Sequence, residues 1–527
     1  MSDWLWWRDG VIYQIYPRSF RDSNGDGIGD LEGIRRQLDH LSWLGVDAIW
    51  LSPCFPSPMK DFGYDVADYC DIDPTFGSLA DFDRLLEEAH GRNIRIVLDW
   101  VPNHTSDLHR WFAASRRDRS DPKRDWYVWR DGKPNGEPPN NWNACFGGSA
   151  WERDPASGQF YLHSFLKEQP DLNWRNPEVE QAMHDVLRFW LDRGVDGFRI
   201  DVVQRLAKDP ELRDNPPATP LGGQRPRAND ENHPDVHGIL RRIRGVLDGY
   251  PERMAVGEVY LLDPLEVGKY YGRGDELHLA FNFNFTFAPW SAASFREQVE
   301  VFEGAVPAEG WPDVVLSNHD NSRHATRFDD PVWGEARARV AAMMLLTLRG
   351  TPFLYYGEEI GMRDVPIADD EMQDPLAWNV HPKFGRDPER SPMQWAAGKG
   401  AGFTAGDRTW LPIGADADAR NVAAQRNDPQ SLLALYRDLI ALRRATPALH
   451  RGDYRSLPAP DDVFAYERSG AGSRAVVALN FGSERRSVDA GSGKVTGGLH
   501  TKPGGKLPAT SGGIELGPSE GVVLVLA

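Results

Sequence analysis

The sequence has few cysteines and no long apolar segment, and both absences narrow the class of protein. Only three cysteines, Cys54, Cys70 and Cys145, occur in 527 residues, and none is part of a CxxC pair. We therefore expect neither a disulfide framework nor a thiolate zinc site. The chain has no run of 18 apolar residues, and its N-terminus lacks the basic start and apolar core of a signal peptide. These features predict a cytoplasmic protein that does not span a membrane.

The chain also has fewer basic than acidic residues. The 60 lysines and arginines are outnumbered by 78 aspartates and glutamates, which gives a net charge of −18 at pH 7. A surface this acidic argues against binding to nucleic acid or to an anionic membrane. The length exceeds what one simple core accommodates, and it suits a large barrel with accessory domains.

Eight short apolar runs rich in β-forming residues predict the core of the fold. They lie at 11–17, 47–53, 95–101, 196–202, 254–260, 279–285, 313–318 and 352–357. Continuous apolar runs are typical of strands buried on both faces of a parallel sheet. Amphipathic helical patterns separate the runs, at 30–44, 79–92, 177–193, 235–248, 293–303 and 334–348. Eight strands alternating with helices predict an α/β protein with a (β/α)8 TIM barrel.

Two long connections and the tail depart from this alternation. Segment 104–174 predicts a domain inserted after the third strand, and 203–234 predicts an irregular lid. Residues 451–527 contain short alternating apolar runs between glycine-rich turns, which predict a separate antiparallel β domain. The barrel itself should then comprise 1–103 and 175–450.

Polar side chains gather directly after the predicted strands, at their carboxyl ends. They are Asp99, His104, Arg199, Asp201, Glu258, His319 and Asp320. In barrels of this kind the active site lies at that edge. Arg199 and Asp201 are two residues apart on one strand, so they should lie side by side, and the arginine should keep the aspartate ionised.

Two of these carboxylates follow successive strands and predict a glycosidase. A retaining glycosidase needs a pair of carboxylates about 5–5.5 Å apart. Asp201 would be the nucleophile, Glu258 the acid/base, and Asp320 a group that stabilises positive charge in the transition state. Two alternatives are a structural ion pair under a loop and a zinc site built from His104, His319 and the acids. The zinc alternative lacks close metal-ligand spacing.

The loop 22–30 carries oxygen donors at regular spacing. The donors are the side chains of Asp22, Asn24, Asp26 and Asp30 and the carbonyl of Ile28. This spacing matches the first part of an EF-hand loop, although Gly33 stands where the bidentate glutamate of that loop belongs. The pattern predicts a structural Ca²⁺ site, with Mg²⁺ as the other candidate ion. Alternatively, the carboxylates only cap the helix that follows.

Four motifs in order resemble the characteristic regions of the α-amylase family of glycoside hydrolases, family 13. The motifs are Asp99-Trp-Val-Pro-Asn-His104, Gly197-Phe-Arg-Ile-Asp201, Gly257-Glu258 and Ser317-Asn-His-Asp320. The resemblance covers nearly the whole chain. It implies a (β/α)8 barrel, a domain inserted after the third strand and a C-terminal β-sandwich. It also implies the same three catalytic roles for Asp201, Glu258 and Asp320.

Three further motifs resemble the α-glucosidase/oligo-1,6-glucosidase branch of that family. They are Gln169-Pro-Asp-Leu-Asn173, Asp61-Phe-Gly-Tyr-Asp65 and Gly385-Arg-Asp-Pro-Glu-Arg-Ser-Pro-Met-Gln-Trp395. The resemblance implies that Asp61 binds the terminal glucose above Tyr64, and that Arg386, rather than Arg390, pairs with Asp61. The loop 22–30 also resembles the metal site of this branch.

The implied glucose pocket draws on further side chains. Its remaining substrate-binding residues are His104, Phe146, Phe165, Gln169, Arg199, Val202 and His319. The two phenylalanines could instead be ordinary core aromatics. Val202, directly after the nucleophile, resembles the residue of α-1,6-specific enzymes, whereas threonine is typical of α-1,4 enzymes. We therefore expect cleavage of α-1,6 or of several linkages.

These features together predict a retaining α-glucosidase that takes α-glucose from the non-reducing end of small oligosaccharides. A transglucosylase or a sucrose/trehalose-type isomerase on the same scaffold is the main alternative. The segment 321–330 lacks the Arg-Leu-Asp-Arg-Asp loop of such isomerases, which weakens that option. A non-catalytic binding protein of the same fold is a remote alternative. We expect a monomer or a small homo-oligomer.

Overall fold

The computed structural model describes residues 4–217 and 226–527, and a barrel of eight parallel strands lies at its centre. The strands are β1 Ile12–Ile15, β2 Ala48–Leu51, β3 Arg95–Trp100, β7 Gly197–Ile200, β8 Met254–Gly257, β9 Leu279–Ala280, β10 Asp313–Val315 and β11 Thr351–Tyr355. Their hydrogen-bonded order is β10-β11-β1-β2-β3-β7-β8-β9. Within the described residues no ladder joins β9 to β10, so the barrel is nearly closed. The predicted fold class is confirmed.

Helices cover the barrel in the predicted alternation. The longest are α5 Leu79–His90, α7 Pro177–Arg193, α8 Val236–Leu247, α11 Ala292–Ala305, α13 Gly334–Thr347 and α16 Leu432–Ala445. Their starts follow from local sequence. A capping box between Ser78 and Asp81 opens α5, whereas α7 starts after Asn176, whose side chain accepts from Glu178 N, with proline at the first helical position.

Two predicted elements differ from the structure. The predicted helix 30–44 is two helices, α3 Leu31–Arg35 and α4 Leu38–Leu44, because Gln37 leaves the helical region with φ −103° and ψ 3°. The predicted strand 279–285 ends at Ala280, and α10 Phe283–Thr286 follows it. A short buried apolar run does not distinguish a strand from a helical turn, and this explains the second error.

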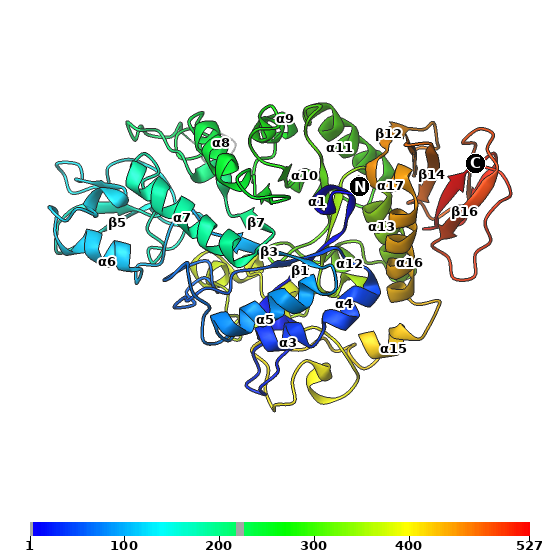
Figure 1. Ribbon diagram of the computed structural model, residues 1–527, viewed down its shortest axis with the longest axis horizontal. Helices are drawn as coiled ribbons and strands as arrows, with labels where there is room; N and C mark the ends of the chain where they lie inside the picture. Colours follow the sequence, from blue (N-terminus) through cyan, green and yellow to red (C-terminus); the bar gives the residue numbers. More distant parts are fainter. Residues whose placement is uncertain (1–3, 218–225) are drawn as a thin grey trace.

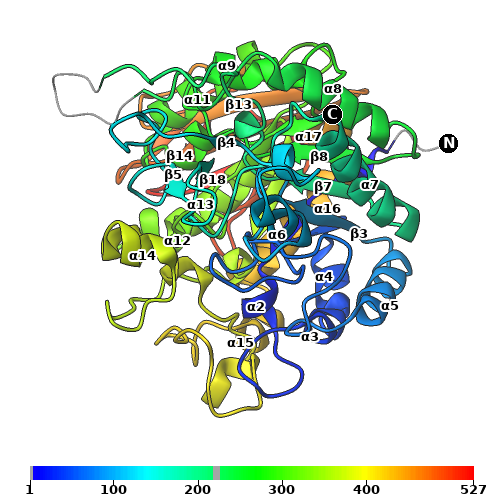
Figure 2. The same cartoon turned by 90° about the vertical axis from the view of Figure 1, so that its left-hand side faces the viewer.

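The segment inserted after β3 lies at one end of the molecule (Figure 1). It contains α6 Arg110–Arg117 and a three-stranded antiparallel sheet in the order β4-β6-β5, formed by β4 Trp129–Arg130, β5 Trp151–Arg153 and β6 Phe160–Leu162. An isolated bridge between His104 and Asp171 ties the start of this segment to its end. Figure 2, viewed from that end, shows α6 and β5 in front of the barrel.

The C-terminal β domain lies at the opposite end of the molecule (Figure 1). A five-stranded antiparallel sheet comprises β12 Asp453–Ser456, β13 Val463–Gly470, β14 Ser473–Asn480, β16 Val495–His500 and β18 Gly521–Leu526. A second sheet pairs β15 Arg486–Val488 with β17 Ile514–Leu516. Apolar side chains from both sheets, such as Val476 and Ile514, share one core. The predicted antiparallel β domain is therefore present.

Long irregular segments lie between the helices and strands. In the predicted lid 203–234, the 3₁₀ turn η2 Val203–Arg205 is the only helix or strand among the described residues, and 218–225 lie outside them. Segment 364–427 holds only short helices, among them α14 Pro375–Asn379 and α15 Val422–Arg426. No helix in the described part of the chain is long and apolar enough to cross a bilayer.

Candidate active site

Three carboxylates meet one guanidinium at the carboxyl ends of three adjacent strands. Arg199, on β7, donates from Nη1 to Asp201 at 2.7 Å and to Asp99 at 2.9 Å. Its Nη2 lies 2.7 Å from Oε2 of Glu258, the residue directly after β8. All four side chains are buried. The parallel barrel, whose strands end together, therefore brings Asp201 and Glu258 to the same cation.

The protonation of this cluster differs from the sequence expectation. Burial raises the pKa of Asp201 well above its ordinary value. Arg199 opposes the rise, and the charges of Glu258 and Asp99 add to it. Burial likewise raises the pKa of Asp99 to about 6, again against Arg199. The expectation that Arg199 keeps the pKa of Asp201 low was wrong, because burial raises this pKa and two further carboxylates share the same guanidinium. Burial and the shared cation therefore disfavour a state in which all three carboxylates are charged at once.

A stacked tyrosine and histidine lie next to this cluster of carboxylates. The rings of Tyr64 and His319 are nearly parallel, 5.4 Å apart, and the tyrosine hydroxyl donates to Asp99 at 3.0 Å. His319 Nδ1 lies 2.8 Å from Gln14 Nε2. Burial lowers the pKa of His319 to about 3, so its ring is neutral at pH 7 and can donate a hydrogen bond from one nitrogen only.

A second arginine ties together three aspartates from distant parts of the chain. Arg386 donates to Asp61 at 2.9 Å, to Asp320 at 2.8 Å and to Asp374 at 2.7 Å. Burial raises the pKa of Asp61 to about 6, although Arg386 works against this rise. Arg390 does not contact Asp61 in the described contacts; it donates to Asp320 at 2.9 Å and to the carbonyl of His319.

The charges around Asp320 keep this residue ionised. Burial on its own would raise the pKa of Asp320. The guanidinium groups of Arg386 and Arg390 nevertheless lower it below the usual range. Asp320 is also the most exposed of the three predicted catalytic side chains, with 23% of its side chain accessible. It therefore carries a stable negative charge at the surface of the site.

The remaining predicted substrate residues line the same region. Gln169 donates to Asp61 at 3.0 Å and lies 3.1 Å from the Nε2 atom of His104. Burial lowers the pKa of His104 to about 4, so it is neutral at pH 7. The rings of Phe146 and Phe165 meet edge to face at 5.9 Å, and the guanidinium of Arg386 lies 5.5 Å from the Phe146 ring. Both aromatics therefore border the charged cluster.

Val202 adopts an unusual backbone conformation next to this cluster. Its φ of 38° and ψ of 49° lie in the left-handed region, which a β-branched residue rarely occupies. Its N–H donates to Glu258 Oε2 at 3.1 Å, and the N–H of Val203 donates to the Glu258 carbonyl at 3.1 Å. The chain that follows β7 is thereby fastened to the end of β8.

The loop 22–30 folds around its own backbone. The carboxylate of Asp22 accepts from the N–H groups of Asn24, Gly25 and Gly27, and Asp30 caps α3 by accepting from Gly33 N at 2.6 Å. Among the described residues, Asp22, Asp26 and Asp30 have no ion pair with a lysine or arginine within 4.0 Å. The carboxylates of the loop are therefore held by backbone N–H groups and hydroxyls rather than by direct ion pairs.

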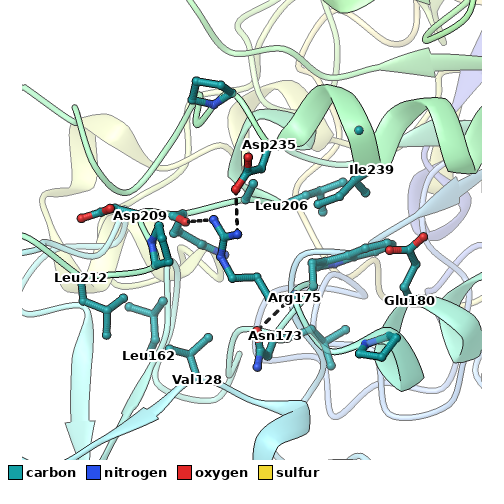
Figure 3. Close-up of a pocket in the computed structure, with 18 of the residues that line it drawn as sticks. Val128, Leu162, Asn173, Arg175, Glu180, Leu206, Asp209, Leu212, Asp235 and Ile239 are labelled. Carbon is teal, nitrogen blue, oxygen red and sulfur yellow. Dashed lines mark hydrogen bonds and ion pairs between the residues drawn. The ribbon is translucent and has the colours of Figure 1, made fainter.

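A cavity of about 560 Å³ lies away from the carboxylate cluster, between the inserted segment and the start of α8 (Figure 3). Apolar side chains, such as Leu162 and Ile239, line it, and Arg175 pairs with Asp235 across it at 2.7 Å. Lys208 on its wall donates to Asn103 at 2.7 Å, and Asn103 in turn contacts His104. None of the three predicted catalytic carboxylates lines this cavity.

Sequence reasoning missed one charged group of the site, Asp374, and one contact, that of Arg390 with Asp320. Asp374 is fully buried and accepts from Nε, Nη2 and the backbone N–H of Arg386. Arg390 supports Asp320, a contact that the sequence prediction did not include. The signal for Asp374 was weak, because a lone aspartate in an irregular segment also reads as a turn residue. Its contact with Arg386 requires the irregular segment between the two residues to fold back on itself, and no local sequence pattern predicts this.

The chain is similar to known proteins over nearly its whole length. A family profile described as "Alpha amylase, catalytic domain" matches residues 14–452. A probable alpha-glucosidase of Rhizobium meliloti (strain 1021) is 46% identical, over 91% of this chain and 90% of that protein. An oligo-1,6-glucosidase of Parageobacillus thermoglucosidasius is 40% identical, over 92% of each chain. Among solved structures, the alpha-glucosyl transfer enzyme XgtA has a TM-score of 0.92 at 42% identity and covers 99% of both chains.

Proposed function

Because the chain belongs to the α-amylase family of glycoside hydrolases, we propose that it is a retaining, exo-acting α-glucosidase that acts on short α-glucosides. Family membership makes it an enzyme with a (β/α)8 barrel. The observation that carries the proposal is the pairing of Asp201 and Glu258 on one buried guanidinium. One carboxylate would attack the sugar while the other gives a proton to the leaving oxygen, as a retaining glycosidase requires.

The proposed reaction has two displacements. Asp201 attacks the anomeric carbon of the terminal glucose, and Glu258 gives its proton to the glycosidic oxygen as the bond to the leaving sugar breaks. Water, deprotonated by Glu258, then attacks the glucosyl–Asp201 ester, so the released glucose keeps the α configuration. Asp320, kept ionised by Arg386 and Arg390, stabilises the positive charge that develops on the sugar ring.

The Asp61–Arg386 pair supports exo action. Asp61, Arg386 and Gln169 are joined by hydrogen bonds of 2.9 and 3.0 Å, and we propose that they hold the hydroxyls of the terminal glucose. Tyr64 would stack under this ring, and His104, His319, Phe146 and Phe165 would enclose it. A pocket closed by an ion pair admits one sugar at a chain end and excludes the middle of a polymer.

Linkage and acceptor are proposed from the relatives and from Val202. Val202 directly follows Asp201 and its N–H donates to Glu258, so it lies beside both proposed catalytic carboxylates, and we propose α-1,6 or broad linkage preference. The XgtA structure is that of an α-glucosyl transfer enzyme, which favours some transfer to a sugar hydroxyl in place of water. A dedicated transglucosylase or isomerase is the second candidate.

Three further properties belong to this proposal. We propose that loop 22–30 binds Ca²⁺ through the predicted oxygens, since its carboxylates form no ion pair within 4.0 Å among the described residues and hard cations prefer oxygen ligands. The ion would brace the loop between α3 and Thr404, which donates to Asp22. We also propose a cytoplasmic location, and a monomer or small homo-oligomer.

Glucose release from isomaltose, maltose, sucrose, trehalose and kojibiose tests the function, with the anomer followed by NMR. Initial appearance of α-glucose is expected, with isomaltose among the best substrates. Initial β-glucose would contradict the assigned mechanism. Transfer products in place of glucose would favour the transglucosylase over the α-glucosidase.

A further inference from the structure

The carboxyl of Glu258 has two different oxygens in this structure. Oε2 accepts from Arg199 Nη2 at 2.7 Å and from the backbone N–H of Val202 at 3.1 Å. An oxygen that accepts hydrogen bonds from two N–H groups is the unprotonated oxygen of the carboxyl, both in the acid form and in the carboxylate. In the acid form the proton therefore belongs on Oε1. Which oxygen faces the glycosidic bond is thus fixed by two donors, one from a side chain and one from the backbone.

The backbone donor depends on the strained turn at Val202. This residue is buried, with 7% of its surface accessible, and it sits at φ 38° in a region that favours glycine. Hydrogen bonds from Val203 N to the Glu258 carbonyl and from Arg205 N to the Val202 carbonyl hold the turn at 3.1 and 2.9 Å. Strained residues persist where the surroundings over-determine them, and they cluster at active sites. Here the left-handed conformation of Val202 directs its N–H toward Glu258.

We infer that the Val202 N–H is a positioning group that orients the acid/base carboxyl of Glu258. The inference rests on the proposed role of Glu258. When the Oε1–H proton passes to the glycosidic oxygen, Asp201 forms its bond to the anomeric carbon and the leaving sugar keeps the bonding electron pair. Glu258 is then a carboxylate, and the two donors on Oε2 stabilise the new charge. The contact therefore grows stronger as the transition state is reached, which accelerates the chemical step.

Replacing the amide at Val202 by an ester tests the inference without changing a side chain. The variant carries 2-hydroxy-3-methylbutanoic acid at this position and so lacks only the N–H. We expect kcat/KM for isomaltose to fall by about 10-fold or more, as for loss of a hydrogen bond to a charged group. For α-glucosyl fluoride, whose leaving group needs little protonation, kcat/KM should change much less. The basic limb of the isomaltose pH profile should move to higher pH, because a carboxyl that loses a donor releases its proton less readily.

One matched variant serves as the control. The same ester at Val203 removes an N–H that binds the Glu258 backbone, and it should leave the isomaltose-to-fluoride ratio at the wild-type value. Thermal unfolding establishes that each variant is folded.

The outcomes separate this inference from the proposed function. An equal loss on both substrates, or no loss on either, for the Val202 ester would overturn the inference. The Glu258→Gln variant tests the underlying acid role and should lose isomaltose cleavage far more than fluoride cleavage. If Glu258→Gln shows no such difference, the proposed acid role itself is wrong, whatever the Val202 ester does.

Discussion

Neutralising Asp374 should weaken substrate binding more than it slows the chemistry. Its carboxylate accepts from Arg386 Nε at 3.0 Å and from Nη2 at 2.7 Å, and both groups are buried or nearly so. In Asp374→Asn the side chain keeps its shape, but one oxygen becomes an NH₂ that faces an N–H donor. Losing one charge-assisted bond costs about 1.5–3 kcal/mol, or roughly a 10- to 150-fold change in an equilibrium constant.

The expected loss falls on KM because of how Arg386 is shared. Asp61 and Arg386 would hold glucose hydroxyls that do not react, so their contacts stabilise the bound substrate and the transition state equally. Asp320 keeps its second arginine, Arg390, at 2.9 Å, so the proposed stabilisation of the transition state survives. We therefore expect KM for isomaltose to rise about 10-fold or more, with kcat reduced by less than about 3-fold.

Steady-state kinetics on isomaltose, with unfolding in urea as a check of the fold, measures this split. Asp370→Asn is the matched control, since Asp370 is exposed in the same segment, and it should leave both constants unchanged. A folded Asp374→Asn enzyme with an unchanged KM would refute the reasoning. So would a loss confined to kcat, which would mean that Asp374 acts on the reacting carboxylates rather than through Arg386.

Three other expectations follow from the structure. Asp201→Ala should lower kcat by about 10⁴-fold or more while the thermal transition persists, and ordinary activity in this variant would remove Asp201 from the nucleophile role. Burial lowers the pKa of His278 to about 3, and its ring accepts from Ala255 N, so below pH 6.5 the unfolded chain takes up a proton that the folded chain excludes. The stability advantage of the wild type over His278→Asn should therefore shrink by about 1.4 kcal/mol per pH unit below 6.5 in urea unfolding, and a difference independent of pH would contradict this. A chelator should lower the melting temperature more than it lowers turnover of the folded enzyme, and an unchanged melting temperature would argue against a metal in loop 22–30.

The parts of the fold that were predictable are those fixed by short-range patterns. Strands such as β3 and β11 are buried on both faces, so their sequences are continuous apolar runs. Asp201 and Glu258 directly follow two further buried strands, β7 and β8, which is why these two acids could be brought together from the sequence. The end of β9 could not be predicted, because the apolar residues after Ala280 suit a strand and a helical turn equally.

The electrostatics of the site were less predictable than its residues. The Arg199–Asp201 spacing correctly indicated neighbours on one strand, but the expected low pKa of Asp201 neglected burial and the two further carboxylates on the same guanidinium. Those partners come from other strands, and their distances are set by the closure of the barrel. The contact of Asp374 with Arg386 likewise depends on a fold-back within an irregular segment.

The ion pair between Asp61 and Arg386 joins two residues that are 325 positions apart in the chain. Contacts of such sequence separation close a long loop, and the entropy of that closure must be overcome before they stabilise the fold. The end of the proposed glucose pocket that this ion pair closes is therefore complete only when the segment after β11 has docked on the loop after β2. A sugar held by this ion pair would require both segments to be in their native positions. It would bind the native chain in preference to partly folded chains and draw the folding equilibrium toward the native state.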